Sequence, residues 1–79
     1  MEWRERIEVN PAVLVGKPVI KGTRISVELI LDRFADGWSM EELLASYPHI
    51  TREDALAALT FAAELFKEEN FIAVGKLTA

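Results

Sequence analysis

Residues Gly16 to Val27 have the sequence GKPVIKGTRISV, and this stretch decides how the first part of the chain is shaped. Pro18 disfavours helical geometry in the residue before it, and Gly22 permits the positive φ that a tight turn needs. Ser26 then supplies a hydroxyl suited to cap a helix start. The stretch therefore predicts an extended arm with a turn, which ends at the N-cap of a helix.

The segment before this stretch has the pattern of an extended chain. Ile7-Glu8-Val9 alternates apolar and polar residues, and Asn10-Pro11 is a common turn signal. Further along, apolar residues flank a turn at Lys21-Gly22-Thr23. We therefore expect a short β-arm or hairpin over residues 1–25.

A first helix is predicted over about residues 27–36. Ser26 is its expected N-cap, and Gly37 is placed to stop it. Its apolar residues recur at the spacing of one helical face, namely Val27, Ile30, Leu31 and Phe34. Such a helix packs one side onto a core.

A second helix is predicted from about Ser39 to Ser46. Ser39 and Glu42 have the spacing of a capping box, in which each side chain accepts a hydrogen bond from the other residue's backbone amide. Pro48 prevents the helix from continuing past Tyr47. This helix should therefore be short.

A third helix is predicted from Arg52 to about Glu69. Thr51 is its expected cap, and Glu53 and Asp54 favour the positive end of the helix dipole. The apolar residues of this helix cover more than one stripe, so we expect one face to bury against another chain. A short helix, a turn and a longer helix form the helix-turn-helix order. The fold class is therefore mainly α, a three-helix bundle preceded by the arm.

Length and composition limit the chain to one small domain. Its 79 residues support a single core, and it contains no cysteine. No apolar run is long enough for a membrane span, and no secretory signal begins the sequence. We expect a cytoplasmic protein made of an arm (1–25), a three-helix domain (26–69) and a C-terminal tail (70–79).

The residue types that support catalysis or metal binding do not gather in this sequence. The single histidine, His49, falls in a predicted surface turn. Ser26 and Ser39 already have capping roles. Adjacent acids are expected on solvated faces or in caps: Glu41/Glu42, Glu53/Asp54 and Glu68/Glu69. We therefore predict no catalytic residue, no cofactor and no metal ligand, and a protein that is not an enzyme.

The charge distribution restricts any DNA contact to a small region. The net charge is -4, yet residues 1–26 carry five bases against three acids. The DNA-binding candidates are three basic residues around the turn of the arm and one at the start of the third helix: Lys17, Lys21, Arg24 and Arg52. An ordinary solvated hairpin and a purely structural helix-turn-helix are the competing interpretations.

Aromatic and aliphatic residues near the C-terminus are candidates for binding a protein partner. Phe66, Phe71 and Ile72 are the proposed anchors, because large apolar side chains carry most of the binding energy at protein interfaces. Trp38 and Tyr47 fit core positions, whereas Trp3 has no packing role assigned by the pattern.

The run from Gly16 to Val27 closely resembles the signature of the bacterial and archaeal domain-of-unknown-function family 433, with Gly-Lys-Pro and Gly-Thr-Arg as its pattern. The resemblance continues through three further motifs, which carry it over most of residues 7–66: Gly37-Trp38-Ser39 with Glu41-Glu42-Leu43-Leu44, Tyr47-Pro48-His49-Ile50-Thr51, and Asp54-Ala55-Leu56-Ala57-Ala58-Leu59.

The resemblance implies a homeodomain-like fold and a regulatory role. Many members of that family look like antitoxins encoded beside a PIN-like, metal-dependent ribonuclease toxin. Such an antitoxin blocks the active site or the RNA-binding surface of its toxin, and often represses its own operon as a dimer. Thr23 and Arg24 also have a structural interpretation, in which they tie the arm to the helices.

Three hypotheses follow. In the first, the chain is a dimeric type II antitoxin that neutralises a PIN-like ribonuclease through the third helix and the tail. In the second, it is a stand-alone helix-turn-helix transcriptional regulator that binds operator DNA. In the third, it is a homodimeric assembly module that does not bind DNA.

Overall fold

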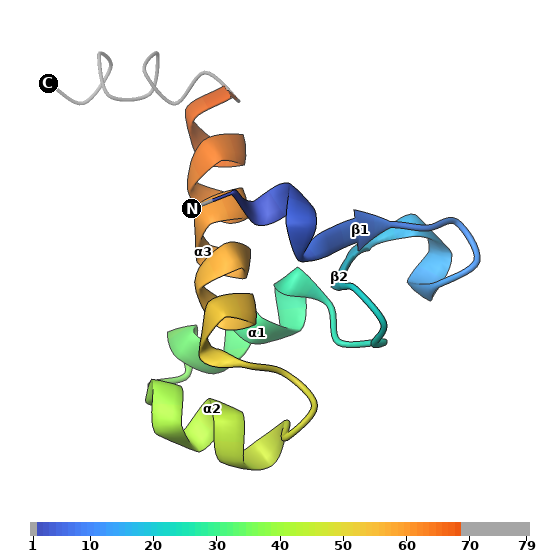
Figure 1. Cartoon of the computed structure of the whole chain (residues 1–79). Coiled ribbons are helices and arrows are strands. Elements are labelled where there is room, and N and C mark those ends of the chain that lie inside the picture. The colour runs from blue at the N-terminus through green and yellow to red at the C-terminus, as the bar shows by residue number, and fades with distance from the viewer. Residues whose placement is uncertain (1, 69–79) are drawn as a thin grey trace, which may run out of the picture.

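A computed structural model describes residues 2–68, which form three helices preceded by a two-stranded antiparallel hairpin (Figure 1). A 3₁₀ turn at Trp3–Glu5 precedes the first strand. The regular elements are β1 (Ile7–Val9), β2 (Pro18–Ile20), α1 (Val27–Ala35), α2 (Met40–Ser46) and α3 (Arg52–Glu68). The expected fold class, a small helical bundle with an N-terminal β-arm, is thus confirmed.

The hairpin is closed by residues 10–17, and the turn at residues 21–24 comes after it. β1 and β2 pair in a register that sets Ile7 opposite Ile20 and Val9 opposite Pro18. Lys17 is extended, with φ −72° and ψ 146°, as the following proline requires. Gly22 has φ +76°, so the predicted positive φ is confirmed. The turn at residues 21–24 therefore links the hairpin to α1.

Thr23 organises that turn. Its hydroxyl donates to the Ile20 carbonyl at 2.8 Å and accepts from the Ile25 amide at 3.0 Å, and the Ile20 amide donates to the Ile25 carbonyl at 2.9 Å. Ser26 follows and its hydroxyl accepts from the Leu29 amide at 2.9 Å. The arm thus delivers Ser26 to cap α1, as the sequence predicts.

The boundary between α1 and α2 also follows the sequence signals. Gly37 has φ +95°, and the Trp38 amide donates to the Arg33 carbonyl at 3.0 Å in a Schellman-type ending. Ser39 and Glu42 form the predicted capping box, with bonds of 2.8 Å and 3.1 Å. The hydrogen bond from the Ser39 amide lowers the pKa of Glu42.

The core lies where the base of the arm meets all three helices. Val19 of β2, Ile30 of α1 and Leu43 of α2 are fully buried, and Ile7 of β1 and Ile20 of β2 are buried as well. Short alanines of α3 allow it to approach the other elements closely: Ala55, Ala57 and Ala58. None of the helices within residues 2–68 has both the length and the apolar character that crossing a bilayer requires.

Candidate interaction surfaces

Asp54 joins the arm to the start of α3. One carboxylate oxygen accepts from the Thr51 amide at 2.9 Å, and the Thr51 hydroxyl accepts from the Asp54 amide at 3.1 Å. The other oxygen accepts from Nη1 of Arg6 at 3.0 Å. The prediction that Asp54 takes part in a helix cap is confirmed. The prediction that it lies on a solvated face is wrong, because Asp54 is only 8% exposed. Arg6 was not predicted as its partner, because nothing in the sequence pairs residues 48 positions apart.

Lys17 lies apart from the other predicted DNA contacts and is paired with an acid. Its Nζ donates to Oε1 of Glu28 at 2.8 Å, which raises the pKa of Lys17 and lowers that of Glu28. The strand β2 separates it from Lys21, and four residues of strand span about 13 Å. The sequence predicted that Lys17, Lys21 and Arg24 cluster around one turn, and this prediction is wrong for Lys17.

Lys21, Arg24 and Arg52 are exposed and make no side-chain hydrogen bond or ion pair with any other residue between 2 and 68. The Lys21 amide donates to the Arg6 carbonyl at 2.9 Å, and Arg6 reaches Asp54 in the first turn of α3. This chain of contacts fixes the turn of Lys21 and Arg24 relative to the start of α3.

The second half of α3 carries an exposed apolar stripe. Leu59, Ala63 and Phe66 recur at i, i+4 and i+7, a spacing that puts them on one helical face. Leu59 is 38% exposed and Phe66 is 56% exposed. Of the three predicted partner anchors, Phe66 lies on this exposed face, whereas Phe71 and Ile72 lie outside the described residues. We call Leu59, Ala63 and Phe66 the α3 stripe.

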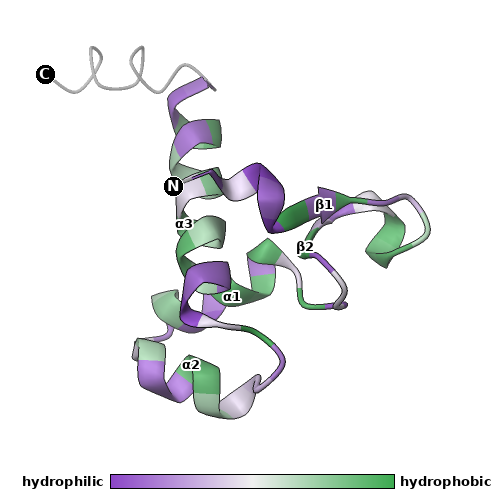
Figure 2. Cartoon of the chain, viewed as in Figure 1, coloured by the Kyte–Doolittle hydropathy of each residue, from purple (hydrophilic) through white to green (hydrophobic). Residues whose placement is uncertain are grey.

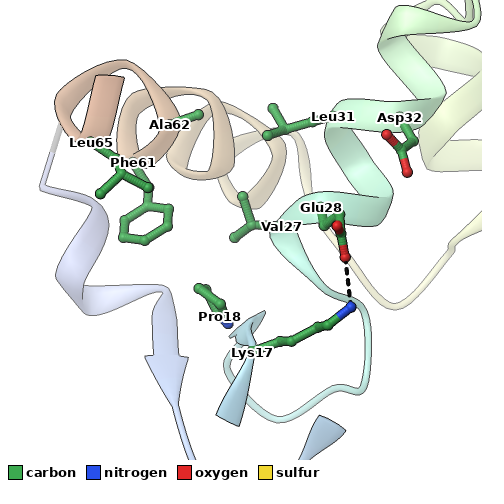
Figure 3. Close-up of a pocket in the computed structure, with 9 residues that line it drawn as sticks. All are labelled: Lys17, Pro18, Val27, Glu28, Leu31, Asp32, Phe61, Ala62 and Leu65. Atoms are coloured by element: carbon green, nitrogen blue, oxygen red, sulfur yellow. Dashed lines mark hydrogen bonds and ion pairs between the residues drawn. The ribbon is translucent and has the colours of Figure 1, made fainter. Parts of the chain in front are cut away.

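An open groove of about 320 Å³ lies between α1, the start of β2 and another face of α3 (Figure 3). Its walls are apolar, and the ion pair of Lys17 with Glu28 stands at its rim beside Asp32. The apolar side chains that line it are Pro18, Val27, Leu31, Phe61, Ala62 and Leu65. No sequence pattern predicted this groove, because three separate segments of the chain build it.

The hairpin loop ends in a left-handed turn that carries apolar side chains. Leu14, Val15 and Gly16 have φ of +47°, +56° and +78°. Positive φ is a true outlier for a β-branched residue such as valine. Val15 is 95% exposed and Leu14 is 37% exposed, and the far end of the arm shows hydrophobic colouring in Figure 2. The arm thus presents an apolar tip, defined here as Leu14 and Val15.

Four of the described aromatic residues form two ring contacts. Trp3 packs edge-on against Phe61 with ring centroids 4.6 Å apart, which gives Trp3 the packing role that the pattern left open. Trp38 stacks on Tyr47 at 6.2 Å, and Arg33 lies over Trp38 while its Nε donates to the Tyr47 hydroxyl at 3.2 Å. Both contacts pack against the core.

His49 is exposed in the turn between α2 and α3, as predicted. Among residues 2–68, no three histidine, aspartate or glutamate side chains converge in a group that could hold a metal ion.

Comparisons with known proteins identify the family. A protein of Sinorhizobium fredii (strain NBRC 101917 / NGR234) named "Uncharacterized protein y4eO" is 34% identical over 59 residues, which cover 75% of this chain and 27% of that protein. A crystal structure of a DUF433 member protein from Anabaena variabilis ATCC 29413 matches with a TM-score of 0.70 and 32% identity, over 90% of this chain and 65% of that one.

The chain thus spans about a quarter of the rhizobial relative and just under two thirds of the cyanobacterial one. The family model described as "Protein of unknown function (DUF433)" matches residues 7–62, from β1 into the second half of α3. These residues include the groove-lining part of α1 and the whole arm tip. The chain belongs to the DUF433 family.

Proposed function

We propose that this protein is the antitoxin of a type II toxin–antitoxin pair, which binds and neutralises a PIN-like ribonuclease. The observation that carries the proposal is the α3 stripe of Leu59, Ala63 and Phe66, exposed on a helix whose other faces pack against α1 and the arm. An amphipathic helix with anchors at i, i+4 and i+7 is suited to lie in a hydrophobic groove of another protein. Binding of this kind needs no catalytic residue in the antitoxin.

The test is co-expression of the chain with the ribonuclease encoded by the neighbouring gene. We expect the two proteins to co-purify, and RNA cleavage by the ribonuclease to stop at an equimolar ratio. Replacing a buried anchor by a charge costs binding energy at such interfaces, so Leu59→Asp and Phe66→Asp should each weaken inhibition by at least about tenfold.

Ala45→Asp is the matched control, because Ala45 is exposed on α2 and the change adds the same charge. It should inhibit like the wild type. A ribonuclease that neither co-purifies with the chain nor loses activity would refute the proposal, as would anchor variants that inhibit as well as Ala45→Asp.

A second candidate function is sequence-selective DNA binding, either alone or for autoregulation. Lys21 and Arg24 favour it, because they are exposed and have no acidic partner in the described part of the chain. Cations held in this way by a shaped turn can contact phosphates. The test is a mobility shift of the DNA upstream of the gene, which Lys21→Glu and Arg24→Glu should weaken.

A further inference from the structure

We infer that the arm tip of one copy of this chain inserts into the apolar groove of a second copy, and that the reciprocal insertion completes a symmetric dimer. The inference assigns a dimerisation surface that is separate from the α3 stripe, so it does not depend on the antitoxin proposal.

The first observation is the tip itself. Val15 projects 95% of its surface into solvent from a turn in which it and Leu14 both have positive φ. Residues held in rarely populated backbone conformations concentrate at binding sites, where the conformation serves to present a side chain. Nothing within residues 2–68 covers Val15, so an apolar side chain is presented outward in a defined geometry.

The second observation is the groove. Its volume of about 320 Å³ equals that of roughly ten water molecules in the liquid, which is room for the two aliphatic side chains of the tip. Its lining is apolar, from Pro18 and Val27 to Leu31 and Leu65, so water inside it gains few hydrogen bonds. Tip and groove therefore match in polarity and in size.

The third observation is that the tip and the groove lie close together along the chain. Lys17 and Pro18 line the groove, and Pro18 follows Val15 by three residues, a chain length of at most about 11 Å. A two-fold dimer needs a patch that is complementary to itself, in which a residue of one copy meets a different residue of the other, and the reverse. The apolar arm tip and the nearby apolar groove together form such a patch.

Sedimentation equilibrium of the full chain tests dimerisation. We expect a monomer–dimer equilibrium in the wild type, and a rise of at least about tenfold in the dissociation constant for Val15→Asp, because one change removes both insertions of the dimer. Ala62→Trp, which fills the groove, should have the same effect. Ala45→Asp, with the same added charge on α2, should dimerise like the wild type.

Cysteine cross-linking tests the geometry, and the natural chain contains no cysteine to interfere. Val15→Cys and Leu65→Cys chains, one of them carrying a mass tag, should form a disulfide-linked heterodimer when mixed and oxidised. Each variant oxidised alone should cross-link much less. A chain that stays monomeric, tip variants that dimerise normally, or Val15→Cys that cross-links best with itself would each overturn the inference.

The two proposals fail in different experiments. Val15→Asp changes the arm tip and leaves the α3 stripe intact, so it should still inhibit the ribonuclease while it fails to dimerise. Phe66→Asp changes the stripe and should still dimerise. A Val15→Asp chain that loses inhibition together with dimerisation would contradict the assignment of two separate surfaces.

Discussion

Among the charged residues that the structure describes, Asp54 is the one whose side chain both caps a helix and pairs with a base of the arm. Its side chain is 12% exposed and accepts hydrogen bonds from Thr51 and Arg6, so its removal leaves the helix end without its cap and Arg6 without its counter-charge. Loss of a cap costs about 1 kcal/mol, and loss of one member of a buried pair costs more. Since Arg6 is 39% exposed, solvent reduces the second term.

We therefore expect Asp54→Ala to lower the free energy of unfolding by about 2 kcal/mol in urea titrations. The neighbouring Glu53 is exposed and makes no hydrogen bond or ion pair within residues 2–68, so Glu53→Ala should change stability by less than about 0.5 kcal/mol. Equal losses for the two variants would show that the effect comes from the helix dipole rather than from the link to the arm.

The positive φ values at the arm tip lead to a second prediction about stability. Val15 has φ +56°, which costs a β-branched residue about 1–2 kcal/mol, whereas glycine adopts it freely. Val15→Gly should therefore stabilise the monomer by about 1 kcal/mol, while Gly16→Ala, at φ +78°, should destabilise it by about the same amount. An added Cβ at Gly16 meets only Pro11 Cα at 3.9 Å, so the loss comes from the backbone.

Urea unfolding at concentrations below the dimer dissociation constant measures both effects without interference from association. Val15→Gly that destabilises the monomer would mean that the valine side chain is held by contacts within its own chain. Together with the dimerisation assay, this variant separates the stability of the turn from its use as a contact.

At the scale of the element, α2 depends on its capping box because it is only seven residues long. The pKa of Glu42 is lowered in the folded state by the hydrogen bond from the Ser39 amide. A carboxyl whose folded pKa is depressed stabilises the fold above its unfolded pKa, about 4.3, and this contribution is lost as the pH falls through the folded value.

The difference in melting temperature between the wild type and Glu42→Gln should therefore be larger at pH 7 than at pH 3. Thermal unfolding followed by circular dichroism at both values measures it. Glu41→Gln is the control, because Glu41 is exposed in the same turn and makes no hydrogen bond in the described part of the chain. A Glu42→Gln difference that is independent of pH would contradict the role given to the ionised carboxylate.

At the scale of the whole molecule, local rules account for the elements better than for the surfaces. Ser26, Gly37 and the Ser39–Glu42 box set helix ends through bonds within a few residues, so their positions were predictable from the sequence. The groove and the Arg6–Asp54 pair depend on residues far apart in the chain, and periodicity does not encode such contacts. The exposure of Phe66 was predictable because α3 has more apolar residues than one buried face can use.

The left-handed tip shows a second limit of sequence reasoning. Gly16 was recognisable as part of a motif, yet nothing in the residue types of Leu14 and Val15 predicts positive φ, because both disfavour it. The eight residues that close the hairpin impose it. The strand β2 separates Lys17 from Lys21, which sequence alone had placed around one turn.

The separation of Lys17 from the other bases leads to a prediction for DNA binding by the whole molecule. With a net charge of -4, the chain repels DNA at long range, so binding must rest on a few local phosphate contacts that release counterions. Each such contact contributes about 0.9 to the slope of log affinity against log salt concentration. Lys21 and Arg24 have no acidic partner within residues 2–68, whereas Lys17 is neutralised by Glu28 at 2.8 Å.

Lys21→Gln and Arg24→Gln should therefore each reduce the magnitude of that slope by about 1, and Lys17→Gln, with the same change in net charge, should leave it unaltered. Fluorescence anisotropy of labelled upstream DNA, titrated at several salt concentrations, measures the slopes. If the lysine variants lowered affinity equally and changed the slope alike, the effect would reflect net charge alone. Only a difference between them would show that the turn after β2, rather than the arm as a whole, contacts the phosphates.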